Sequence, residues 1–128
     1  MRISFVIPSA PRTKKTSNRI VRVGRFQKVL PSKAFVEWNA IAQIYLNRVR
    51  SASPMWLRDS RGRRVNCAAL FYRKTNVGDA TGYYQALADA LQEARIVEND
   101  KLIVTWNGSQ LLKDAANPRI EVTLTEAA

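Results

Sequence analysis

The stretch from Asp79 to Asp100 most constrains how this chain can fold, because it has the pattern of one helix followed directly by a strand. Apolar residues recur at helical spacing along one side of the stretch, at Ala80, Tyr83, Tyr84, Leu87, Ala90, Leu91 and Ala94. A second stripe beside that face contains Thr81, Gln85, Ala88 and Gln92. The β-branched and apolar run 101–106 then predicts a strand.

Two carboxylates flank this predicted helix. Asp79 stands at its entry, and Asp100 lies in a short acidic turn just after it. Acids placed in this way can hold a divalent cation between the first helical turn and the next strand. Each acid also has a structural interpretation: Asp79 is well placed as an N-cap, and Asp100 suits an ordinary turn. The residues alone leave both interpretations open.

The other segments predict a mixed α/β fold of the α+β kind, in one domain that covers residues 1–128. The expected strands cover residues 2–8, 65–72, 101–106 and 119–125, with a short hairpin at 20–28. Together with two main helices, these strands predict a mixed sheet in a single domain.

Local signals mark the ends of several segments. Ser32 is expected to cap a helix that continues to about Arg50. Residues 51–64 predict a loop with a basic end, which either meets DNA or is only a charged turn. Asn107-Gly108 is a hairpin-turn signal.

The few metal-binding residue types restrict the chemistry. The chain has no histidine, and its single cysteine, Cys67, lies in an apolar run that predicts a buried reduced thiol. Zinc bound by histidine and cysteine is therefore excluded, as is a histidine-based catalytic triad. A metal here must be held by oxygen, which favours magnesium or manganese.

The charge is large and unevenly distributed. The net charge is +11, and the sequence pI is about 10.5. Residues 1–73 carry 16 basic side chains and two acids, whereas residues 74–128 carry five basic side chains and eight acids. This division favours nucleic acid as the partner over a protein that is merely basic. The cations expected to hold phosphates are Arg12, Lys14, Lys15, Arg19, Arg73 and Lys74.

No hydrophobic segment indicates a membrane. No apolar run approaches the ~18–20 residues of a membrane span. The first ten residues lack the apolar core and cleavage pattern of a signal peptide. A protein without a membrane partner is therefore expected.

The motif around the focal helix resembles that of the RusA family of Holliday-junction resolvases, which are phage-associated endonucleases. The family signature is roughly D-x-D-N-x-x-K-x-x-x-D-A-L, followed by an acidic turn before an Ile/Val strand. The corresponding run here is DATGYYQALADAL from Asp79, and Asn99-Asp100 precede the next strand. The opening strand, the basic loop, the PSK helix start and the closing strand are also similar to that family.

The resemblance implies a magnesium-dependent, structure-specific endodeoxyribonuclease that resolves Holliday junctions or other branched DNA in recombination and repair. It implies a RusA-like fold, a homodimer and a cytoplasmic location, in a bacterial host or encoded by a phage. Asp79 and Asp100 correspond to metal-binding carboxylates and would be the catalytic pair, with Mg²⁺ or Mn²⁺ as cofactor.

The motif departs from the family at three positions. Thr81 replaces the second aspartate, Gly82 the asparagine and Gln85 the lysine. Thr81 and Gln85 can still offer neutral oxygens, and Glu98 and Asp114 are the two candidates for the missing acidic ligand. The departures favour the alternative function of a DNA- or junction-binding protein that does not cut. A third hypothesis is a basic interaction protein whose partner is an acidic protein.

Overall fold

The computed structural model describes residues 1–14, 19–30 and 32–127. The strands are β1 (Arg2–Ile7), β2 (Arg19–Val23), β3 (Phe26–Leu30), β4 (Val65–Arg73), β5 (Ile103–Thr105), β6 (Gln110–Lys113) and β7 (Arg119–Glu126). The helices are α1 (Lys33–Ala52), α2 (Pro54–Asp59) and α3 (Ala80–Glu93), with a 3-10 turn η2 (Asp100–Leu102) before β5. The expected mixed α+β class is confirmed, and α1 and α3 are its two main helices.

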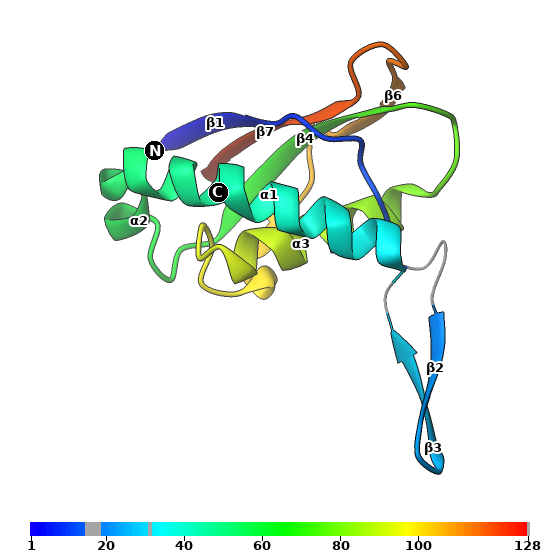
Figure 1. Ribbon diagram of the computed structural model, residues 1–128. Coiled ribbons are helices and arrows are strands. Elements are labelled where there is room, and N and C mark those ends of the chain that lie inside the picture. Colours follow the sequence, from blue (N-terminus) through cyan, green and yellow to red (C-terminus); the bar gives the residue numbers. More distant parts are fainter. Residues whose placement is uncertain (15–18, 31, 128) are drawn as a thin grey trace.

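One mixed sheet forms the body of the molecule, and α1 and α3 cover the same face of it (Figure 1). The strand order is β1-β7-β4-β5, with β6 also paired to β4. Strand β7 runs antiparallel to both β1 and β4, whereas β5 and β6 run parallel to β4. Alternate residues of β4 are buried, as expected for a strand with helices on one face only.

The core lies between this sheet and the two main helices. The buried face of α3 contains Tyr83, Ala86, Leu87, Ala88, Ala90 and Leu91, so the predicted apolar side of this helix is confirmed. Helix α1 begins at the expected cap, because Ser32 Oγ accepts the Phe35 N–H at 3.1 Å. Cys67 is fully buried, and burial raises the pKa of its thiol.

Two local predictions are wrong. The expected loop 51–64 contains α2, which begins with Pro54 at its first position and buries Trp56. The Trp56 indole N–H donates to the Ile96 carbonyl at 3.3 Å, so a contact outside the segment holds this short helix in place.

Asn107-Gly108 forms the predicted turn, but the strands on either side of it do not pair with each other as a hairpin. Strands β5 and β6 both pair with β4. Thr105 lies opposite Asn66 and Gln110 opposite Leu70, so the connection from β5 to β6 is one residue longer than the matching stretch of β4. The connection is a β-turn in which the Ser109 N–H donates to the Trp106 carbonyl at 3.1 Å, and Gly108 supplies a positive φ of 91°. The Asn66 side chain accepts the Asn107 N–H and donates to the Asn107 carbonyl. Strand β6 is therefore an additional strand that the predicted order lacks.

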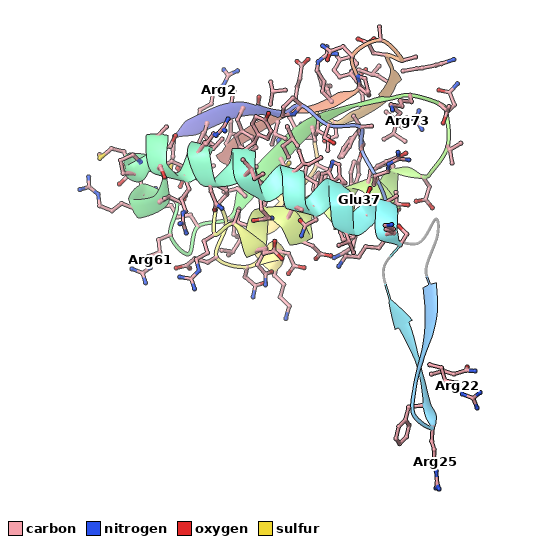
Figure 2. All side chains as sticks on the ribbon, in the orientation of Figure 1. Arg2, Arg22, Arg25, Glu37, Arg61 and Arg73 are labelled. Atoms are coloured by element: carbon pink, nitrogen blue, oxygen red, sulfur yellow. The ribbon has the colours of Figure 1, made fainter. Side chains whose placement is uncertain are left out.

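The second sheet is the expected hairpin, formed by β2 and β3, and it projects away from the body (Figure 1). Arg22 and Arg25 extend from it into solvent (Figure 2). Within the described ranges, no helix combines the length and apolar character that crossing a membrane requires.

Candidate functional site

Asp79 caps α3. Its Oδ1 accepts the Gly82 N–H at 2.9 Å, which satisfies one of the free donors in the first helical turn. A Cβ on Gly82 would lie 2.9 Å from that oxygen and 3.1 Å from a methyl carbon of Thr13. Glycine at this motif position therefore permits the close approach of the cap. The Asp79 side chain is exposed, and the cap uses only one of its two oxygens.

Asp100 is placed by a contact with the other end of the same helix. Its backbone N–H donates to Gln92 Oε1 at 2.8 Å, and Asn99 caps the 3-10 turn that begins at Asp100. The residue is half-buried. Neither contact uses the Asp100 carboxylate.

The Asp100 side chain faces a hollow in the surface of α3, which we call the α3 hollow. It has a volume of about 270 Å³ and is lined by Thr81, Tyr84, Gln85, Ala88, Asp100, Ile103 and Trp106. Three of the four residues of the predicted second stripe, Thr81, Gln85 and Ala88, thus line it, whereas Gln92 does not. Asp79 is not among these lining residues; it lies two positions before Thr81, at the cap.

Two aromatic side chains form a wall of the α3 hollow that the sequence interpretation missed. The rings of Tyr84 and Trp106 stack with centroids 4.5 Å apart and planes 3° apart. Tyr84 was assigned to the apolar face and Trp106 to the end of a strand. The position of Tyr84 could have predicted this. It is one residue before Gln85 and four before Ala88, so it lies at the border between the apolar face and the second stripe.

The donors in the α3 hollow fit a hard cation. Gln85 Nε2 donates to Asp89 Oδ1 at 2.9 Å, and the atom of this amide that could bind a cation is its oxygen. Asp100 adds a carboxylate and Thr81 a hydroxyl, and magnesium prefers oxygen ligands while keeping several waters. Over residues 1–14, 19–30 and 32–127, no group of three His, Cys, Asp or Glu side chains gathers. Asp100 is the one carboxylate among the residues that line this hollow, so a second acidic ligand would come from outside its lining.

Arg73 is largely used by the fold. It is 9% exposed, and its guanidinium donates to the carbonyls of Leu112 at 3.2 Å, Val77 at 3.4 Å and Gly78 at 3.5 Å. These bonds fix the loop that leads into Asp79. Arg12 and Lys74 are exposed and, with Arg73, line a hollow of about 100 Å³ near the start of α3.

The other cations expected to hold phosphates are Lys14, Lys15 and Arg19. Lys14 pairs with Asp89 at 2.5 Å and lies over the Phe35 ring, 5.4 Å from its centroid. Lys15 lies outside the described residues. Arg19 belongs to β2, and only its backbone is described. The Lys14 ammonium is thus already neutralised by a carboxylate next to Gln85.

Asp114 lies in a separate ion-pair cluster between β6 and β7. Its Oδ2 accepts a hydrogen bond from Arg119 at 3.0 Å, and its Oδ1 accepts the Asn117 N–H at 3.1 Å. The hydrogen bond from Arg119 lowers the pKa of Asp114. Arg119 also pairs with Glu121 at 2.7 Å. The structure therefore gives Asp114 a role in this cluster and does not bring it into the α3 hollow.

No family model matches the chain, and no curated protein matches it. The likeness to the RusA family therefore rests on the motif residues.

Proposed function

We propose that the protein is a RusA-like, magnesium-dependent endodeoxyribonuclease that acts on Holliday junctions or other branched DNA. One observation supports this proposal above the others. Thr81, Gln85 and Asp100 occupy three positions of the family motif, and all three line the α3 hollow. A helix stripe and a turn beyond its end thus meet at one set of oxygen donors.

In this proposal, Asp100 and Asp79 are the carboxylate ligands, with Thr81 and Gln85 as neutral donors. Magnesium or manganese would supply the Lewis-acid chemistry that activates water against a phosphodiester. Asp79 contributes the oxygen that the cap does not use, and its cap holds Thr81 in the first turn. The net charge of +11 favours binding of the polyanionic substrate.

The proposed assembly is a homodimer. Resolution of a four-way junction needs two cuts placed symmetrically, and two sites related by a two-fold axis supply them. Sedimentation of the protein alone and with a junction tests this part, since a monomer in both states would contradict it.

A nicking assay on a synthetic four-way junction with Mg²⁺ tests the activity. Asp100→Asn should lower the cleavage rate about 100-fold or more, because a metal ligand supplies several kcal/mol. Asp79→Asn keeps a capping oxygen and should also lower the rate. Asp114→Asn is the matched control and should leave cleavage unchanged. Activity that survives Asp79→Asn would remove that residue from the site.

A second candidate is a junction-binding protein that does not cut. The observation that favours it is that Asp100 is the single carboxylate among the lining residues of the α3 hollow, where Thr81 and Gln85 replace charged motif positions. Calorimetry with Mg²⁺ and Mn²⁺ separates the two functions. Junction binding without metal binding and without cleavage would select the non-cleaving protein.

A further inference from the structure

Four arginines, two from helices and two from the turns that follow α2 and α3, gather around the C-terminal end of α3. Arg50 comes from α1, Arg58 from α2, Arg61 from the turn after it and Arg95 from the turn after α3. Together with Gln92 and Glu98 they line an open hollow of about 840 Å³, which we call the arginine groove. Figure 2 shows Arg61 on this side of the molecule, at the opposite end from Arg73.

The acids nearby leave the arginine groove positive. Arg61 pairs with Glu98 at 2.9 Å and Arg58 with Asp59 at 3.6 Å, and all four side chains are about half or more exposed. Exposed pairs of this kind contribute little to stability. Four arginines and two acids leave a net charge of +2. The groove therefore suits a polyanion that brings several negative charges.

The backbone of Arg95 gives independent support. Helix α3 ends in a Schellman motif, in which the Arg95 N–H donates to the Gln92 carbonyl and the Ile96 N–H to the Leu91 carbonyl. Arg95 has a φ of 59° and is the one non-glycine residue with positive φ in the described part of the chain. Glycine adopts this conformation with the least strain. The turn alone therefore does not explain an arginine here, whereas a use for its side chain in the groove does.

Interaction with helix dipoles explains part of the arginine groove. Arg50 and Arg58 lie in the last turns of α1 and α2, where a cation interacts favourably with the negative helix end. The same interaction does not account for Arg61, which follows α2, or for the strained backbone of Arg95. The two explanations also predict different results. Loss of an interaction with a helix dipole would lower the stability of the protein, whereas loss of a phosphate contact would weaken DNA binding.

The arginine groove adjoins the α3 hollow. Gln92 lines the groove, and its Oε1 accepts the Asp100 N–H at 2.8 Å. A nucleic acid strand that crosses Asp100 would therefore meet the arginines next.

We propose that the arginine groove binds the phosphate backbone of a duplex DNA arm that extends from the α3 hollow. DNA as the polyanion rests on the proposed function, but the groove serves a cutting and a non-cutting protein equally. Arginine suits this ligand because its planar guanidinium binds phosphate oxygens in pairs.

Binding of a labelled duplex arm and of a four-way junction, measured by fluorescence anisotropy over a range of salt, tests the proposal. Arg95→Gly should weaken binding several-fold and reduce the slope of log K against log salt by about one. Its melting temperature should stay unchanged or rise, because glycine fits the positive φ. Weaker binding with unimpaired stability is the expected result.

A matched pair on α1 removes equal charge inside and outside the groove. Arg50 lines the groove, whereas Arg48 lies over the Tyr45 ring and is not among the lining residues. Arg50→Gln should weaken binding and reduce the salt slope more than Arg48→Gln does. Equal effects would overturn the proposal, since net charge alone would then explain them. Arg95→Gly that binds as tightly as the wild type would also overturn it.

The test separates this proposal from the proposed function. A wild-type protein that binds the junction through the arginine groove but does not cut it would keep the groove and reject the nuclease. Cleavage that needs Asp100 but is unaffected by groove variants would reject the groove and keep the nuclease. No DNA binding at low salt would reject both.

Discussion

The two ends of α3 use their charged side chains in opposite ways. At the N-terminal end, Asp79 accepts a backbone N–H and the buried Arg73 donates to three carbonyls. At the C-terminal end, backbone N–H groups of Arg95 and Ile96 satisfy the last carbonyls of the helix. The Arg95 side chain is exposed, and neither of these bonds uses it. Where the backbone groups at a helix end bond to one another, a charged side chain nearby can bind a ligand. Where they do not, the charged side chain is needed to satisfy them.

The largest expected effect tests how the C-terminal end is held together. Trp56→Ala should lower the free energy of unfolding by about 3–5 kcal/mol, because the buried indole joins α2 to the end of α3. Trp56→Phe is the control and should lower it by about 1–2 kcal/mol through the lost hydrogen bond and reduced burial. Urea denaturation measures both. A loss near zero for the alanine variant would show that α2 does not hold this end.

Arg73→Met should show that the N-terminal end uses its arginine for the fold. Three carbonyls would lose a charged donor, so the free energy of unfolding should fall by about 2 kcal/mol. Arg12→Met removes an exposed arginine from the same hollow and should change it by less than about 0.5 kcal/mol. Thermal denaturation together with DNA binding measures the contrast. Unchanged stability with weaker DNA binding would make Arg73 a phosphate ligand.

The two acids beside α3 should also differ in their effect on stability. Asp79→Ala removes the N-cap and should lower the free energy of unfolding by about 1 kcal/mol. Asp100→Ala keeps the backbone bond to Gln92 and should change it by less than about 0.5 kcal/mol. Denaturation of both variants without added metal makes the comparison. Equal losses would mean that the Asp100 carboxylate also supports the fold.

The smallest effect concerns Asp114, an acid that already has a cationic partner. The hydrogen bond from Arg119 lowers the pKa of Asp114 below its ordinary 3.8. Its contribution to stability is therefore present above pH 3.8 and is lost as the pH falls through the lower folded-state pKa. Asp114→Asn should remove that part of the acid dependence and leave junction binding at neutral pH unchanged. Melting temperatures measured across the acid range check this prediction, and an unaltered pH profile would contradict it.

Local signals in the sequence predicted most of the regular structure. The apolar spacing of α3, the alternation in the outer strands and the caps at Ser32 and Asp79 depend on neighbours within a few residues. Helix α2 escaped prediction because a helix of six residues is too short to show a period, and its Trp56 is held by a carbonyl 40 positions away. Asn107-Gly108 forms the expected turn, but a turn signal does not specify which strand each neighbour pairs with, and β5 and β6 both pair with β4.

In the candidate site, too, some features follow from local sequence and others from contacts between distant segments. The sequence by itself determined that Thr81 and Gln85 share a stripe of α3 and that Asp79 begins the helix, since helical geometry fixes the direction of each side chain. The tertiary structure decided that Asp100 lines the hollow with that stripe, and that Arg50, Arg58, Arg61 and Arg95 form one groove. These residues meet because packing and hydrogen bonds join segments that are far apart in the chain. The pattern of any one segment does not contain such contacts.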